Sequence, residues 1–141
     1  MTGVEVKNIL PFSTGVIGER LQIKSLTSAF EKCSKSLKKN NFNNLATSIM
    51  TTDKKVKISK RVVKIGNKKF SILGVAKGVG MIEPNMATTL SFVFTDLKIS
   101  ESSLKKIHKS ICNETFNSIS IDGDQSPSDS SILVATGKNL I

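Results

Sequence analysis

The residues best suited to chemistry lie in the segment 77–90, which lacks ordinary helix and strand signals. Two glycines within it permit positive φ, and Pro84 fixes its own backbone and restricts the residue before it. Thr88 and Thr89 follow, at the start of the apolar run 90–94. Such a loop can aim a threonine hydroxyl as a nucleophile, either at a substrate or at the carbonyl group of the preceding residue.

A second candidate is a hydroxyl-glycine loop at residues 13–18, which contains Thr14 and Gly15. The Thr14 hydroxyl and nearby backbone N–H groups could stabilise a developing oxyanion. From spacing alone, a plain turn is the simpler interpretation. The order GxxxxGK[ST] is absent, so the segment is not a phosphate loop.

Thr51 and Lys77 are candidate substrate contacts. Thr51 follows a short predicted helix, and its hydroxyl could bind a substrate or belong to an ordinary polar helix end. The Lys77 ammonium could pair with a substrate carboxylate. Because lysine is abundant in this chain, composition alone favours a surface role for Lys77.

The aspartates of the segment 122–129 lack the residue order of an EF-hand, so a polar turn is the expected structure. His108 is the only histidine, which makes a Ser-His-Asp triad or a histidine-based metal site within this chain unexpected. We predict no metal site. Cys33 and Cys112 are predicted to be small core residues.

The chain has 141 residues, of which 38% are hydrophobic, and a formal net charge of +10. This length allows one domain with a core, and no apolar run is long enough to span a membrane. The basic residues are almost all lysine, with no Tyr or Trp for stacking, which argues against nucleic-acid recognition. The first residues lack the pattern of a secretory signal, so a cytoplasmic location is expected.

Strand and helix patterns alternate along the sequence. Strands are predicted over 4–10 and 89–95, and a hairpin over 56–65 and 69–75 turns at Gly66.

Amphipathic helices are predicted over 25–39 and 101–116, the second capped by Ser100, and a shorter helix begins at Asn43 or Asn44. Two further strands are predicted over 118–121 and 132–136. This order indicates a mixed α/β (α+β) class, with helices layered on a sheet.

Several segments, in this order, resemble the glutamate N-acetyltransferase family, also called ornithine acetyltransferase, of arginine biosynthesis. The most specific is PNMAT at 84–88. The matching segments are 13–18 (STGVIG), 49–53 (IMTTD), 76–88 (AKGVGMIEPNMAT), 95–96 (TD), 116–117 (FN) and 121–124 (IDGD). Two places depart from the family pattern: Val79 replaces the usual Ser or Ala between the glycines, and the loop 124–130 differs from the family's DTSTNDT.

The resemblance implies the site residues. The family precursor cuts itself before the threonine of PNMAT, which here is the Ala87–Thr88 bond. Thr88 would then be the acyl-carrying nucleophile, and Thr14 with Gly15 the oxyanion hole. Thr51, Lys77 and Thr88 would contact substrate.

The resemblance also implies the organisation. Residues 1–141 would form a single partial domain of a layered sheet-and-helix sandwich, incomplete here. Residues 1–87 would form the end of an α chain, and residues 88–141 the start of a β chain. Full-length members would assemble as α2β2 tetramers.

The activity implied is transfer of an acetyl group from N-acetylornithine to glutamate, without a cofactor, a nucleic acid or a membrane. Acetyl-CoA as a second acetyl donor is left open. The alternatives are an inactive fragment of the family, a related amino-terminal-nucleophile peptidase and, less favoured, a basic nucleic-acid-binding module.

Overall fold

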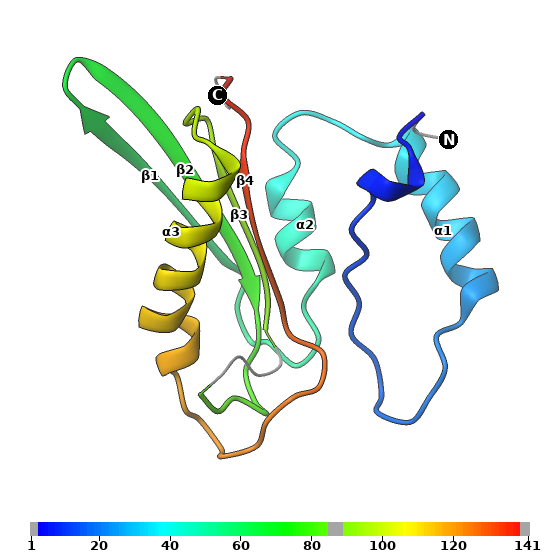
Figure 1. Cartoon of the computed structure of the whole chain (residues 1–141). Coiled ribbons are helices and arrows are strands. Elements are labelled where there is room, and N and C mark those ends of the chain that lie inside the picture. The colour runs from blue at the N-terminus through cyan, green and yellow to red at the C-terminus, as the bar shows by residue number, and fades with distance from the viewer. Residues whose placement is uncertain (1–2, 85–88, 139–141) are drawn as a thin grey trace. The chain divides into compact units, whose positions relative to one another are not determined.

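The computed structural model describes residues 3–84 and 89–138. Its contacts separate the chain into two units, residues 1–41 and 42–141. The second unit is built on a four-stranded sheet with the strand order β1-β2-β3-β4 (Figure 1). Strands β1, β2 and β3 pair antiparallel, and β3 pairs parallel with β4. The strands are Lys57–Ile65 (β1), Lys68–Lys77 (β2), Leu90–Thr95 (β3) and Ser130–Ala135 (β4).

The β1–β2 hairpin confirms the sequence prediction. Lys57 pairs with Ala76 at one end of the ladder, and Ile65 pairs with Lys68 at the other. Gly66 begins the two-residue turn with a φ of 58°, a conformation that glycine adopts without steric cost. The prediction for β3 is also confirmed, to within one residue.

Helix α3 (Glu101–Glu114) connects β3 to β4 and begins as the sequence predicted. The Ser103 N–H donates to the Ser100 hydroxyl, which therefore caps the helix. A short 3-10 turn, η2 (Phe116–Ser118), follows. Such a crossover is needed because parallel strands cannot be joined by a tight hairpin.

Helices α2 (Phe42–Ser48) and α3 cover opposite faces of the sheet. The rings of Phe42 on α2 and Phe94 on β3 lie 5.3 Å apart. On the other side, His108 of α3 contacts Ser131, which pairs in register with Ser91. Since Ser91 and Phe94 are three residues apart on one strand, their side chains point to opposite faces. The class is therefore layered α/β, as predicted.

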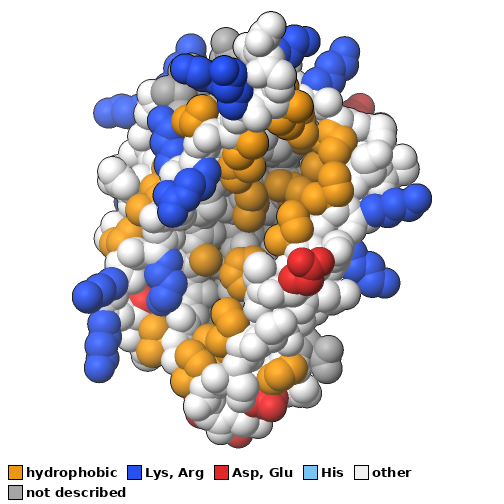
Figure 2. Space-filling view, turned by 90° about the vertical axis from the view of Figure 1, so that its left-hand side faces the viewer, with side chains coloured by type: hydrophobic (Ala, Val, Ile, Leu, Met, Phe, Trp, Pro, Cys, Tyr) orange, Lys and Arg blue, Asp and Glu red, His pale blue; other side chains and the backbone are white. Residues whose placement is uncertain are grey.

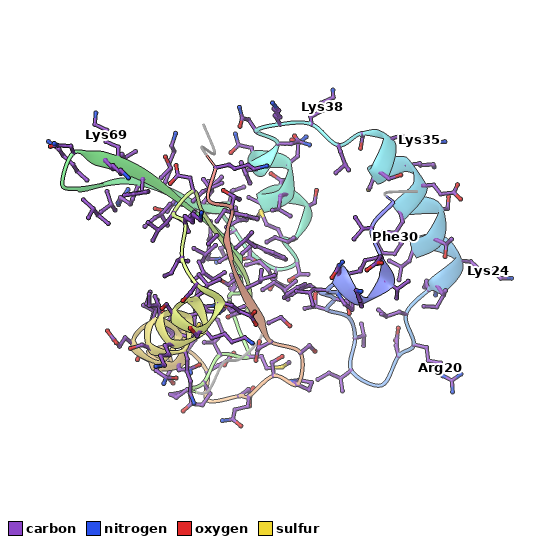
Figure 3. The ribbon with its side chains drawn as sticks, turned by 45° about the horizontal axis from the view of Figure 1, so that its top comes forward. Arg20, Lys24, Phe30, Lys35, Lys38 and Lys69 are labelled. Carbon is purple, nitrogen blue, oxygen red and sulfur yellow. The ribbon has the colours of Figure 1, made fainter. Side chains whose placement is uncertain are left out.

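The first unit contains the 3-10 turn η1 (Val6–Asn8) and helix α1 (Ile23–Lys35). Helix α1 starts and ends earlier than predicted. Figure 3 shows Phe30 on the side of α1 that faces η1, while Lys24 and Lys35 project away from the helix. The apolar side chains of α1 remain largely exposed, Phe30 at 62%.

Three sequence predictions about the elements and the core are wrong. The predicted strand 4–10 is replaced by η1, because the Asn8 and Ile9 N–H groups bond to carbonyls three residues earlier and not to a neighbouring strand. The predicted strand 118–121 is absent, since η2 occupies its start and Ile121 makes a single backbone bond to Ile82. Cys33 is exposed because the α1 face is not covered, whereas Cys112 is buried as predicted.

The predicted short helix is confirmed as α2, and the last predicted strand as β4. The buried apolar residues lie in the second unit, on α2, β2, β3 and α3 and in the loop after β2. None of the helices in the described ranges is long and apolar enough to cross a membrane.

Candidate active site

The loop that follows β2 is held by a carboxylate from far along the chain. Met81 N–H and Ile82 N–H donate to the two oxygens of Asp122, at 2.6 and 2.9 Å. These hydrogen bonds lower the pKa of Asp122, which keeps its carboxylate ionised. Met81 has a φ of 57°, which is uncommon for a residue with a side chain. Asp122 thus stabilises an unusual backbone conformation.

Lys77 ends β2 and is 2% exposed. The surface role that composition favoured for this lysine is therefore wrong. A lysine ammonium is costly to bury unless an anion compensates it. The Asp129 carboxylate attracts Lys77 electrostatically, and Asp53 binds the backbone of the next residue, Gly78.

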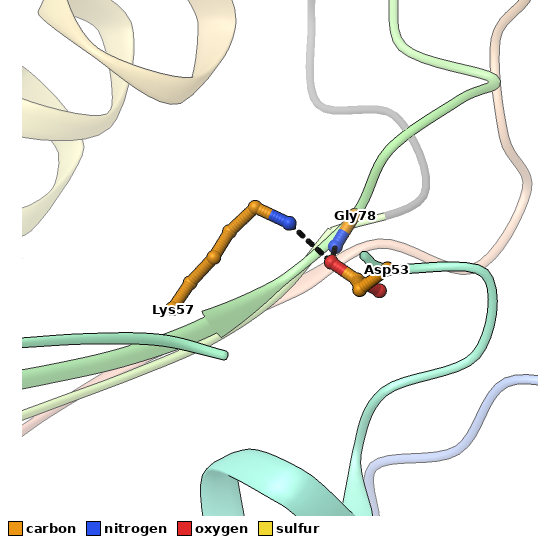
Figure 4. A network of polar contacts seen from close by, with 3 residues as sticks. All are labelled: Asp53, Lys57 and Gly78. Atoms are coloured by element: carbon orange, nitrogen blue, oxygen red, sulfur yellow. Dashed lines mark hydrogen bonds and ion pairs between the residues drawn. The ribbon is translucent and has the colours of Figure 1, made fainter. Parts of the chain in front are cut away.

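Asp53 joins the segment that follows α2 to the end of β2 (Figure 4). Its Oδ1 accepts from the Gly78 N–H at 3.0 Å and from the Lys57 ammonium. Burial raises the pKa of this carboxyl, but the hydrogen bonds from Lys57 and Gly78, with the charge of Lys57, outweigh burial and leave the pKa lowered. Oδ2 is buried and has no hydrogen-bond partner among the described residues.

Asp129 contacts the residue that follows the segment 85–88 in sequence. Its Oδ1 accepts from the Thr89 N–H at 2.5 Å, just before β3. Burial raises the pKa of Asp129, while the Thr89 hydrogen bond and the charge of Lys77 oppose this rise. Its Oδ2 is also buried and lacks a partner within the described ranges.

The structure brings some of the sequence-predicted residues together. Thr51, which is exposed, lies two residues before Asp53, and Lys77 directly precedes the Gly78 that Asp53 binds. Asp53 therefore joins the segment that carries Thr51 to the end of β2, where Lys77 lies. Ala87 and Thr88 lie outside the described residues.

The predicted oxyanion-hole residues belong to the first unit. Thr14 is half-buried, and Gly15 is exposed. An added Cβ at Gly15 would lie 3.6 Å from the Leu21 side chain, an ordinary contact distance. Steric crowding within the described residues therefore does not require glycine at this position.

An apolar pocket of about 290 Å³ lies against the strands, and Lys57, which binds Asp53, contributes to its lining. Val93, Phe116 and residues of β1 and β2 line it. Figure 2 shows one face of the molecule, where hydrophobic side chains gather around a hollow bordered by Lys and Arg. No group of His, Cys, Asp or Glu in the described part of the chain could hold a metal ion.

Sequence reasoning missed Asp53, Asp122 and Asp129 as functional candidates. Asp53 and Asp122 fall in segments that carry the family resemblance, and this position in the sequence could have identified them as candidates. Asp129 lies in the loop that departs from the family pattern, and its partner is forty residues away in sequence. No local pattern reports such a contact.

Comparison with known proteins identifies the family of this chain. The ArgJ family model matches residues 1–140. The chain is 43% identical over 138 residues to the arginine biosynthesis bifunctional protein ArgJ of Pseudomonas fluorescens, with 98% of this chain and 34% of that protein covered. It is 45% identical over 134 residues to the protein of the same name from Thermotoga neapolitana, with 95% and 34% covered. A Nostoc relative, ArgJ 2, is 46% identical over 136 residues, with 96% and 34% covered.

The chain belongs to the ArgJ family. It spans about a third of the length of these curated relatives.

Proposed function

We propose that this chain carries the nucleophile and part of the substrate site of a self-processing acetyltransferase. The reaction is transfer of an acetyl group from N-acetylornithine to glutamate through an acetylated Thr88. One observation carries the proposal: carboxylates hold the backbone on both sides of the segment 85–88, next to the buried Lys77. The names of the relatives place them in arginine biosynthesis, which supports this substrate class.

Self-cleavage begins with attack of the Thr88 hydroxyl oxygen on the Ala87 carbonyl carbon. The peptide C–N bond then breaks, and the nitrogen takes up a proton to become the Thr88 α-amine. The resulting ester is hydrolysed by water, which leaves the Ala87 carboxylate and a free Thr88 hydroxyl. Before cleavage this nitrogen is an amide, so it cannot act as the base.

The new α-amine, with a pKa of about 8, is partly unprotonated near neutral pH. It can accept the proton of the Thr88 hydroxyl as the oxygen attacks the acetyl carbonyl of N-acetylornithine. Ornithine leaves with a proton on its amine. The amine of glutamate then attacks the acetyl ester, and N-acetylglutamate is released with regeneration of Thr88.

Each acetyl step passes through a tetrahedral oxyanion. Thr14 and Gly15 are proposed to donate to it, and loss of one such donor typically costs about 3–4 kcal/mol of transition-state stabilisation. Lys77 and Thr51 are proposed to bind the substrate. No cofactor is required by these steps, and acetyl-CoA would be a second acetyl donor. An α2β2 assembly is proposed for full-length members.

The test is the intact mass of the purified chain, compared with Thr88→Ala. We expect pieces 1–87 and 88–141 from the native chain and a single uncut mass from the variant. An acetyl adduct on the 88–141 piece after incubation with N-acetylornithine would then identify the nucleophile. A native chain that stays uncut under folding conditions would reject self-processing and favour an inactive member of the family.

A further inference from the structure

The polar segment 120–130 contacts the residues that precede the segment 85–88 in sequence and the residue that follows it. On one side, Gln125 donates to the Pro84 carbonyl oxygen at 3.1 Å, in addition to the contacts of Asp122. On the other side, Asp129 accepts the Thr89 N–H. One loop therefore holds both ends of the link that joins β2 to β3.

Asp129 differs from the other contacts in its surroundings. The Asp122 carboxylate belongs to an exposed residue, whereas Asp129 is half-buried with a buried Oδ2 atom, and Lys77 is buried. Ionised groups in such a place are retained at a cost unless they compensate each other. The charge of Lys77 opposes the rise that burial causes in the pKa of Asp129, and the Thr89 N–H that Asp129 accepts ties this carboxylate to the start of β3.

Register explains why this position matters. Lys77 pairs with Leu90, the residue that follows Thr89. Asp129 therefore contacts the backbone immediately before the first ladder pair, one residue after Thr88. A displacement of about 1 Å in a reacting group can reduce a rate by about 100-fold.

We propose that Asp129 is a positioning residue for cleavage at Ala87–Thr88: its carboxylate holds the Thr89 N–H beside Lys77 and so fixes the backbone that carries the nucleophile. This inference rests on the proposed function and adds a residue to it. The competing explanation is a loop contact that serves stability alone.

The experiment follows the cleavage of the chain over time by intact mass, for wild type, Asp129→Ala, Asp129→Asn and Asp124→Asn. Alanine removes the acceptor, and we expect cleavage to slow by about 100-fold. Asparagine keeps an oxygen for the Thr89 N–H but loses the charge that faces Lys77, so we expect partial rescue, to a loss of about 10-fold. Asp124→Asn makes the same charge change in the exposed part of the loop, and its rate should equal that of wild type.

Urea unfolding of each variant separates positioning from stability. The inference requires the rate to fall in protein that remains folded. It is overturned if Asp129→Ala cleaves at the wild-type rate, or if its slower cleavage is accounted for by an unfolded fraction. Both results leave the proposed self-processing intact, provided that wild type is cut.

A second measurement does not depend on cleavage. In the uncleavable Thr88→Ala chain, the Thr89 amide resonance should shift as the Asp129 carboxylate is titrated, and Asp129→Asn should abolish the shift. An unresponsive Thr89 amide would overturn the inference by itself. A responsive amide in a chain whose wild-type form is never cut would instead reject the proposed function, and the positioning role with it.

Discussion

At the scale of single residues, the candidate site is organised by three aspartates. Asp53, Asp122 and Asp129 each accept at least one backbone N–H from the segments that flank 85–88. A carboxylate that accepts backbone N–H groups fixes the chain more firmly than a neutral acceptor, since charge-assisted hydrogen bonds are about twice as strong. Lys57 donates to Asp53, and the charge of Lys77 acts on Asp129. Both lysines therefore have a structural role, besides any contact with a substrate.

Asp53→Asn should destabilise the chain at neutral pH. The Asp53 side chain is 1% exposed, and loss of a charged hydrogen bond at such a site costs about 1–3 kcal/mol. Because folding lowers the pKa of Asp53 below its ordinary 3.8, the stabilisation is complete above that value and is lost as the pH falls below it.

Urea unfolding at pH 7 and at acid pH measures this effect. The difference in unfolding free energy between wild type and Asp53→Asn should narrow as the pH falls below 3.8. Asp124→Asn is the matched control and should show little difference at either pH. Equal midpoints for wild type and Asp53→Asn at pH 7 would contradict the role given to Asp53.

At the scale of elements, the sequence predicted those whose signals are local. The apolar periodicity and Ser100 predicted α3, and the glycine of the turn predicted the β1–β2 hairpin. The prediction of a strand at 4–10 failed because a strand also needs a neighbouring strand, and local sequence does not report one. The contacts of the site could not be predicted for the same reason, since Asp122 and Asp129 bind backbone about forty residues away.

Ser100→Ala should weaken the start of α3. The Ser100 hydroxyl accepts from the Ser103 N–H at 3.3 Å, and loss of such a cap costs about 1 kcal/mol. Chemical denaturation of the purified variant would measure this loss. Ser102→Ala, which removes a hydroxyl in the same turn without removing the cap, should be closer to wild type.

Phe42→Ala should loosen α2 from the sheet. The Phe42 ring lies 5.3 Å from the Phe94 ring and is half-buried, so we expect a loss of about 1–3 kcal/mol, smaller than for a fully buried aromatic. Because α2 precedes the segment with Thr51 and Asp53, the Gly78 amide should also exchange faster with solvent. The measurement is hydrogen exchange at the Gly78 amide in wild type and in Phe42→Ala. An unchanged exchange rate would show that the packing of α2 does not stabilise the contact between Asp53 and Gly78.

At the scale of the whole molecule, the proposed cut lies between two strands that pair with each other. Strand β2 precedes it and β3 follows it, and six residue pairs join them from Ile72–Thr95 to Lys77–Leu90. The contacts of the loop 120–125 with residues 81–84 also cross the cut. Cleavage would therefore remove one covalent bond and leave the sheet continuous.

The pieces 1–87 and 88–141 should therefore remain associated after cleavage. Native mass spectrometry or gel filtration should give one species with the mass of the uncut chain, and denaturant should separate it into two. Thr88→Ala, which stays uncut, is the control for elution position. Pieces that elute separately without denaturant would contradict the strength assigned to the β2–β3 ladder.

The short link between β2 and β3 also determines how the sheet can be regained after it is lost. While the bond at 87–88 is intact, the two strands meet within one molecule at an effective concentration in the millimolar range. Once the bond is cut, pairing of β2 with β3 requires two separate pieces to associate. The unfolding midpoint of the cut protein then depends on protein concentration. If a cut molecule unfolds in dilute solution, its two pieces must find each other again before the sheet can form. An assembled protein would therefore require that the chain folds first and is cut second.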